Sequence, residues 1–231
     1  MSERYSGMDF DTSSLPLLSR TLAGAETLEP QPIRDSLEPA IRNQHQCAAA
    51  GMDDLVIADK TTCRYIAAAG TASCRSFFLR NPKTSASVIA HMSSGIDETR
   101  FLESISRIAK RGDTLDLYIM GGDGFRDYLE NGNMLYYDPN ADPETAQEVE
   151  ESLANLFQHT VPAGIGINPR VVNLYSNKPT YNAVLDLQNG EFFYVSDETI
   201  KSHLLRNEEH DPPNNAPLQI VFDSLKKGLS R

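Results

Sequence analysis

The chain has 231 residues, 40% of them hydrophobic, which is enough for one sizeable domain with extensions. A formal net charge of −11 argues against a nucleic-acid ligand, because phosphate contacts need a basic face, and against adsorption on anionic lipid. No run approaches the roughly twenty apolar residues that cross a bilayer, so membrane insertion is not expected.

Residues 1–50 are rich in Ser, Glu, Pro and Gln. The prolines within 28–32 do not fit inside a regular element, whereas short helices are possible over 14–23 and 36–42. We therefore predict a polar, partly ordered N-terminal extension over 1–50. Because residues 1–6 lack the apolar core of a signal peptide, we expect a cytoplasmic protein as synthesised, or one secreted into a host cell without a cleaved leader.

The core is predicted to occupy residues 51–196. Apolar runs rich in β-branched and aromatic residues predict strands at 55–58, 64–68, 75–79, 87–92, 114–120, 170–175, 181–187 and 191–195. The last two flank Asn189-Gly190, a strong hairpin signal, and amphipathic spacing predicts helices over 98–110 and 143–159. This order predicts an α+β domain with a layered β-sheet or sandwich core and flanking helices.

The C-terminal residues 197–231 are predicted to form a helical extension, in which a Pro- and Asn-rich loop over 211–217 joins one or two helices.

The three cysteines, Cys47, Cys63 and Cys74, form no close pair of the kind that binds zinc. An odd number in a chain of this length does not predict a disulfide framework. His45 and Cys47 are the only closely spaced candidate ligands, so no metal is expected.

Cys74 follows a run of small residues and precedes His91 by 17 positions. The two border the strands predicted at 75–79 and 87–92, and the turn-rich segment 80–85 between these strands predicts a hairpin. Such a hairpin brings the start of its first strand beside the end of its second. Cys74 and His91 would then be neighbours, as a cysteine nucleophile and its base require. Taken singly, each residue also fits a buried structural role.

Two glycine-rich stretches lack the spacing of a phosphate-binding loop. Residues 120–124 are predicted to form a tight turn at a strand end beside the hairpin, and residues 163–167 a loop that enters a strand.

Four segments in order resemble the cysteine-dependent protein glutamine deamidases, a group that includes the chemotaxis protein CheD, the catalytic domain of cytotoxic necrotizing factor and Burkholderia lethal factor. The resemblance covers roughly residues 55–195. Residues 65–74 resemble the small-residue strand that ends at the catalytic cysteine, and 90–92 resemble the segment with the catalytic histidine. Residues 117–122 resemble the strand of CheD that ends in two glycines, and 181–191 resemble the closing hairpin of the family.

The resemblance implies catalytic roles for Cys74 and His91, with the backbone N–H groups of Ser73 and Cys74 forming an oxyanion hole. CheD and the lethal factor carry a threonine six residues before the cysteine, where this chain has Ala68. A backbone carbonyl near Ala68, or the side chain of Thr71, would therefore orient the histidine. Ser73 replaces the glycine that precedes the cysteine in the family.

The function implied by the resemblance is hydrolysis of a glutamine side chain to glutamate in a target protein, through a thioester and without a cofactor. The expected setting is a bacterial toxin or effector, a virulence factor acting on a host protein. The alternatives are a CheD-like chemoreceptor deamidase and a catalytically inactive binding protein on the same fold. A Cys–His pair would also suit a transglutaminase or a protease. The loops expected to recognise the target are 80–85, 121–138 and 174–180.

Overall fold

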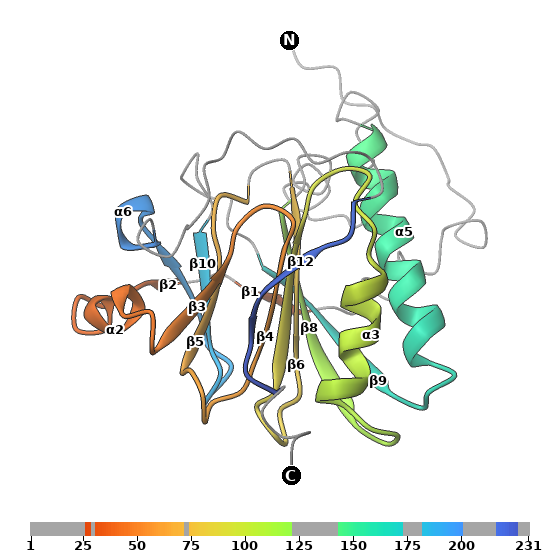
Figure 1. Ribbon diagram of the computed structural model, residues 1–231, viewed down its shortest axis with the longest axis horizontal. Coiled ribbons are helices and arrows are strands. Elements are labelled where there is room, and N and C mark those ends of the chain that lie inside the picture. The colour runs from red at the N-terminus through yellow and green to blue at the C-terminus, as the bar shows by residue number, and fades with distance from the viewer. Residues whose placement is uncertain are drawn as a thin grey trace, which may run out of the picture.

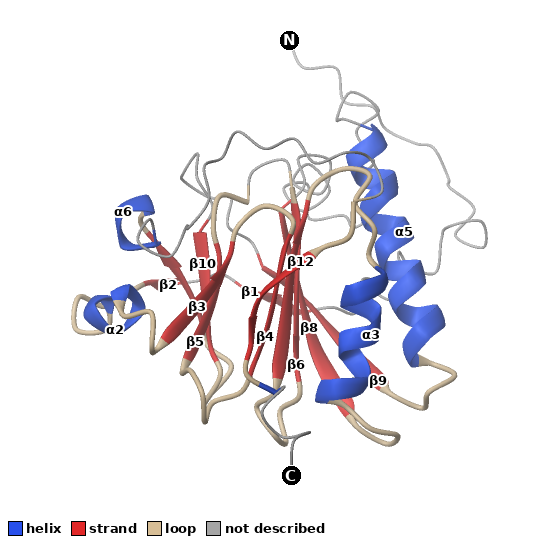
Figure 2. Ribbon diagram, in the orientation of Figure 1, coloured by secondary structure: helices blue, strands red, loops and turns tan. Residues whose placement is uncertain are grey.

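A computed structural model describes residues 26–28, 31–71, 74–121, 143–172, 182–200 and 216–225. These residues form two β-sheets and a small number of helices, so the predicted α+β class is confirmed (Figures 1 and 2). The helix expected over 14–23 lies outside the described residues. None of the described helices combines the length and the apolar character needed to cross a membrane.

The larger sheet contains seven strands in the order β1-β9-β8-β6-β7-β4-β12. They are β1 (Glu26–Leu28), β4 (Asp54–Ala58), β6 (Arg75–Arg80), β7 (Ser87–Met92), β8 (Thr114–Gly121), β9 (Gly166–Val172) and β12 (Gln219–Asp223). The four central strands pair antiparallel, whereas β9, β1 and β12 join their neighbours in parallel. The predicted hairpin is the β6–β7 pair at the centre of this sheet.

The smaller sheet contains five strands in the order β2-β11-β10-β5-β3. They are β2 (Gln31–Pro32), β3 (Cys47–Ala50), β5 (Tyr65–Ala68), β10 (Asn182–Asp186) and β11 (Phe192–Val195). The Asn189-Gly190 turn joins β10 to β11 in an antiparallel hairpin, as predicted. Gly190 has a φ of 78°, a conformation that glycine adopts without the steric cost of a side chain.

The two sheets pack face to face, and helices cover both outer faces (Figure 2). Helices α3 (Thr99–Ile108) and α5 (Pro143–Thr160) pack on the seven-stranded sheet. The short helices α2 (Glu38–Arg42) and α6 (Asp197–Ile200) pack on the five-stranded sheet. The result is a sequence of four layers: helices, sheet, sheet, helices.

Alternation along β6 decides which side chains enter which layer. Phe77 and Leu79 are buried beneath the helices, whereas Phe78 is buried between the two sheets. Because side chains alternate between the faces of a strand, Ser76 belongs to the same face as Phe78. Its cross-strand partner His91 shares that face, since directly opposed residues of an antiparallel pair project to the same side.

Both expected extensions contribute strands to the sheets, and the described part of the segment before residue 51, predicted to be polar and partly ordered, contains regular elements. Strands β1, β2 and β3 precede residue 51, and β12 lies in the tail where helices were expected. The tail does begin with helix α6, but residues 219–223 pair with β4. The triplet Ile220-Val221-Phe222 carries a strand propensity that the helical prediction overlooked.

Helix α3 holds the C-terminal strand in place. Arg107 donates hydrogen bonds from both of its terminal nitrogens to the Asp223 carboxylate, at 2.8 and 2.6 Å. Arg100 donates a hydrogen bond to the backbone carbonyl of Leu218 at 2.8 Å. A forked guanidinium–carboxylate contact fixes orientation as well as charge, so β12 is secured both by β4 and by the helix layer.

Candidate active site

The β6–β7 ladder places the two predicted catalytic positions at the same end of the larger sheet. Ser76 pairs with His91 and Arg75 pairs with Met92, and Cys74 directly precedes β6. The position two residues before Ser76 is a diagonal neighbour of His91, and diagonal neighbours lie about 7–8 Å apart, within reach of long side chains. The predicted hairpin pairing of β6 with β7 is confirmed, and the proximity of the Cys74 thiol to the His91 ring stays a prediction.

His91 is buried between the sheets, with 1% of its surface exposed. Neither ring nitrogen makes a hydrogen bond, although the backbone of Ala50 is close enough to act on the imidazole. Ala50 lies in β3 of the opposite sheet, where it pairs with Ala68. Small side chains at both positions line the region that the imidazole faces. A buried polar group without a partner is uncommon in folded proteins and points to a role beyond packing.

Burial lowers the pKa of His91 from its ordinary value of 6.5 to about 4. The backbone of Ala50 and the negative charge of Asp53 act in the opposite direction, and desolvation outweighs them. The imidazole is therefore neutral at pH 7. A neutral imidazole is the form that can accept a proton from a thiol.

Asp53 is the acidic group that acts on His91, and sequence reasoning missed it. It occupies the turn between β3 and β4 with a φ of 62°, in the left-handed region where Asp and Asn are the most tolerated side chains after glycine. Its Oδ1 accepts hydrogen bonds from the backbone N–H and the hydroxyl of Ser93, at 2.9 and 2.8 Å. Its Oδ2 is buried without a hydrogen-bond partner. Ser93 follows β7 directly, so Asp53 ties this turn to the strand that carries His91.

Thr71 lies beside the same strand end but does not contact the imidazole through a hydrogen bond. Its hydroxyl is 3.0 Å from the Ser76 hydroxyl, and both residues are fully buried. This hydrogen bond links the segment that follows β5 in one sheet to β6 in the other. Because Ser76 is the residue opposite His91 in the ladder, this hydrogen bond places the Thr71 hydroxyl next to that position. Ser76 is a second residue of the region that the sequence did not single out.

The three cysteines differ in exposure. Cys47 and Cys63 are buried, and desolvation raises the pKa of each thiol, that of Cys63 to about 12. Cys74 is partly exposed. A thiol reacts as the thiolate, so the two buried cysteines are poor nucleophiles and Cys74 is the candidate that solvent or a substrate can reach.

The structure gives less information on the other residues predicted for the site. Ala68 lies in β5, and the backbone group that acts on His91 comes from its strand neighbour Ala50. Ser73, whose N–H was expected in the oxyanion hole, lies outside the described residues. Gly121, at the end of β8, pairs with Arg75, so this predicted strand end does lie beside the hairpin.

Residues 80–85 were expected to take part in recognition. Arg80 ends β6 and residues 81–85 lie in the turn to β7, at the opposite end of the hairpin from Cys74, so they do not lie beside the candidate site. Most of the other two expected recognition loops, residues 122–138 and 174–180, lies outside the described residues.

Among the residues that the structure describes, no group of three or more His, Cys, Asp or Glu side chains is arranged to hold a metal ion. No protein-family model matches the chain, and no curated protein sequence matches it significantly. The function proposed below depends on the geometry of the site and on the sequence resemblance.

Proposed function

We propose that this protein is a protein glutamine deamidase in which Cys74 is the nucleophile and His91 its base. The observation that carries the proposal is the β6–β7 register, which pairs His91 with the residue two positions after the partly exposed Cys74. The buried and neutral imidazole supports it, because a neutral ring nitrogen can accept a proton, although the ring has no hydrogen bond to the Cys74 thiol in this structure. We also propose that the fold is similar to those of CheD and cytotoxic necrotizing factor.

In the first half of the reaction, His91 accepts the proton of the Cys74 thiol as the sulfur attacks the carboxamide carbon of a glutamine side chain. The new carbon–sulfur bond gives a tetrahedral oxyanion. Backbone N–H groups around Ser73 and Cys74 are proposed to donate hydrogen bonds to that oxygen. When the intermediate collapses, the carbon–nitrogen bond breaks and His91 returns its proton to the departing ammonia. A thioester remains.

In the second half, His91 removes a proton from water, which attacks the thioester carbon. Collapse of this second intermediate breaks the carbon–sulfur bond, and the proton on His91 returns to the Cys74 sulfur. The carboxylic acid formed loses its remaining proton to solvent, so the product is glutamate, with a negative charge where the target protein had a neutral amide. No cofactor or metal is required in these steps.

The low pKa of His91 shapes this mechanism. Because burial disfavours the imidazolium, the resting pair is proposed to consist of a thiol and a neutral imidazole. The imidazolium then forms only during attack, when the neighbouring sulfur or oxyanion carries negative charge. Asp53 is proposed to stabilise that transient cation, since its charge already acts on the imidazole.

The substrate is proposed to be a protein that presents a glutamine side chain, and the setting is proposed to be that of a bacterial effector that enters a host cell. The sequence resemblance supports both, and the net charge of −11 supports a substrate other than nucleic acid. A catalytically inactive binding protein on the same fold is the alternative that the experiment below tests.

The test is the rate of Cys74 alkylation by iodoacetamide between pH 5 and 9, followed by intact mass and peptide mapping. We expect Cys74 to react selectively, with Cys47 and Cys63 as internal controls in the same sample. At pH 6, His91→Ala should slow Cys74 by about tenfold or more, because a thiol without a base has a pKa near 8.5. A rate that follows an ordinary thiol pKa, unchanged in the variant, would exclude a catalytic pair.

The reaction itself is then tested with candidate target proteins, by mass spectrometry for conversion of glutamine to glutamate. Cys74→Ser is the matched control, since it keeps the size of the side chain and removes the thiol. Incorporation of an added primary amine in place of water would indicate a transglutaminase, and cleavage of the target backbone would indicate a protease.

A further inference from the structure

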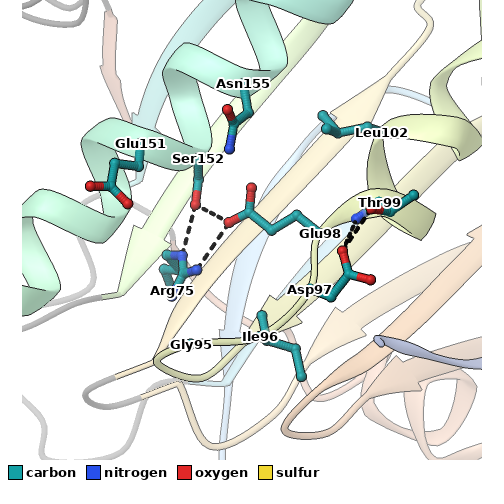
Figure 3. A pocket seen from close by; sticks show the side chains of 10 residues that line it. All are labelled: Arg75, Gly95, Ile96, Asp97, Glu98, Thr99, Leu102, Glu151, Ser152 and Asn155. Atoms are coloured by element: carbon teal, nitrogen blue, oxygen red, sulfur yellow. Dashed lines mark hydrogen bonds and ion pairs between the residues drawn. The ribbon is translucent and has the colours of Figure 1, made fainter. Parts of the chain in front are cut away.

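A second polar site lies on the other face of the same sheet end, away from the Cys74–His91 region. A hollow of about 530 Å³ opens between the start of β6, the N-terminal end of α3 and the middle of α5 (Figure 3). Its polar lining comes from Arg75, Glu98, Glu151, Ser152 and Asn155. This volume lies within the range of pockets that hold small molecules or single side chains.

The floor of the hollow is a buried charged network. Arg75 donates to the Glu98 Oε1, the Ser152 hydroxyl and the Ser93 carbonyl, at 2.9 Å in each case. The Ser152 hydroxyl also donates to the Glu98 Oε1. The side chains of Arg75 and Glu98 are 5% and 9% exposed, so one positive and one negative charge are paired away from solvent.

One oxygen of this network is left over. The Glu98 Oε2 is buried and has no hydrogen-bond partner. Figure 3 shows it directed away from Arg75 and toward the amide of Asn155 on α5. Leaving a buried carboxylate oxygen without a donor has a free-energy cost that a ligand with N–H groups would remove.

The charge of the hollow favours a cation. Among the lining residues that the structure describes, three carry carboxylates, Asp97, Glu98 and Glu151, and one, Arg75, carries a guanidinium. Asp97 is engaged with the Thr99 N–H and hydroxyl, at 2.9 and 2.6 Å. The Glu98 Oε2 therefore offers an acceptor among described lining residues that carry more negative than positive charge.

We propose that this hollow binds an alkylguanidinium or alkylammonium group, presented by an arginine or lysine side chain of a protein or by a free small molecule. The cationic N–H groups would donate to the Glu98 Oε2 and lie near Asn155. The alkyl part would lie against Leu102 and Ile96, the apolar residues of the lining. The proposal does not depend on deamidase activity, because none of its residues is Cys74 or His91.

The test is a titration of the full-length protein with L-arginine amide, followed by protein NMR or calorimetry. L-citrulline amide, which has nearly the same shape without the charge, is the matched ligand control. We expect citrulline amide to bind at least about tenfold more weakly, the size expected for a hydrogen bond to a charged group. Equal binding of the two ligands, or no binding of arginine amide at millimolar concentration, would overturn the proposal.

Two variants assign the binding to this hollow. Glu98→Gln should weaken arginine amide by about tenfold or more, whereas Glu103→Gln, on an exposed part of α3 with the same change in charge, should leave it unchanged. Asn155→Arg carries a guanidinium of its own into the hollow, and should raise the melting temperature and abolish binding. Unaltered affinity in both hollow variants would overturn the proposal, even if Glu98→Gln folds poorly.

Two further experiments ask whether the natural ligand is a protein or a small molecule, and whether binding in the hollow is independent of the proposed active site. A capped peptide with one central arginine should bind more tightly than arginine amide if the natural ligand is a protein, and no more tightly if it is a small molecule. Cys74→Ser should bind arginine amide like the unmodified protein. Loss of binding in Cys74→Ser would overturn the independence of this site from the proposed active site.

Discussion

His91 and Arg75 lie at the same end of the larger sheet and are almost equally buried, yet their surroundings differ completely. Arg75, on the helix side, has hydrogen bonds to two side chains and a backbone carbonyl. His91, on the side between the sheets, has no hydrogen bond from either ring nitrogen. Burial lowers the pKa of the imidazole to about 4, so His91 is neutral at pH 7, whereas Arg75 forms an ion pair with Glu98.

The difference separates a structural polar group from a candidate functional one. A buried charge whose partners are complete stabilises one arrangement of the chain, and removing a partner is costly. A buried polar group without partners lowers stability, and a protein that keeps it gains something other than stability. Hydrogen bonding, more than burial alone, therefore distinguishes the two faces of the sheet where β6 begins and β7 ends.

The largest loss of stability should come from replacing Arg75, whose hydrogen bonds are satisfied. Arg75→Met leaves the Glu98 carboxylate buried without its cation and should lower the free energy of unfolding by about 3–5 kcal/mol. Urea unfolding measures this loss. Lys83→Met is the matched control, because Lys83 pairs with Asp113 at 2.8 Å but its side chain is 64% exposed, and it should change stability far less. Equal losses in the two variants would contradict the structural role of Arg75.

The double variant Arg75→Met with Glu98→Leu sharpens the same prediction. Because it removes both charges together, it should recover a large part of the stability that Arg75→Met loses. A double variant as unstable as the single one would show that the loss comes from packing.

The next largest effect should be a dependence of stability on pH that arises from His91. The folded pKa lies near 4 and the ordinary value is 6.5, so between these values the unfolded chain binds a proton that the folded protein does not. Stability should therefore fall as pH decreases from 6.5 to 4, by about 1.4 kcal/mol per pH unit and about 3 kcal/mol in all from this residue. Urea unfolding at each pH, compared with His91→Leu, isolates this contribution. Parallel pH profiles in the two proteins would contradict the low pKa.

At pH 7.5 we expect His91→Leu to be more stable than the unmodified protein, by about 1–2 kcal/mol, because an unsatisfied buried polar group is replaced by an apolar one. Cys74 alkylation at pH 6 should slow in the same variant. Met92→Leu, the adjacent position of β7 on the helix side, is the control for repacking and should change stability little. A destabilised His91→Leu would mean that the imidazole has a structural partner.

The smallest effect should come from Asp53→Asn. Asparagine tolerates the φ of 62° and can keep the acceptor for Ser93, so the fold should be retained. Loss of the negative charge should lower the pKa of His91 further, since that charge now raises it. An NMR titration of the imidazole measures the change, with Asp97→Asn as the control for net charge. A His91 pKa that moves equally in both variants would exclude a specific role for Asp53.

The elements with clear periodicity were predictable from the sequence. The strands at 55–58, 75–79 and 87–92 occur within one or two residues of their predicted limits, and so do helices α3 and α5. The β6–β7 pairing that carries Cys74 and His91 at one end could be derived because a hairpin is a local structure. Strand β3 could not, because the alanines of Cys47–Ala50 have little strand propensity and are held by the parallel pairing with β5.

The partners of the two buried groups could not be predicted for a similar reason. Arg75 meets Glu98 and Ser152 across 23 and 77 positions of the chain, through the packing of two helices on the sheet. Asp53 reaches Ser93 across 40 positions, through a turn whose backbone conformation has no strong sequence signal. The sequence indicated the candidate residues Cys74 and His91, and tertiary structure determined what surrounds them.

The parallel pairing of β12 with β4 can form only late in biosynthesis, because the two strands are far apart in the chain. A ribosome releases β4, β7 and β6 long before residues 219–223 emerge, so the nascent sheet has β4 as an open edge for more than half of translation. Unpaired edges recruit other strands, which makes this interval the most aggregation-prone stage of folding. Expression of chains shortened before residue 216 should therefore yield aggregates, while fusions placed beyond residue 225 leave the closing strand intact.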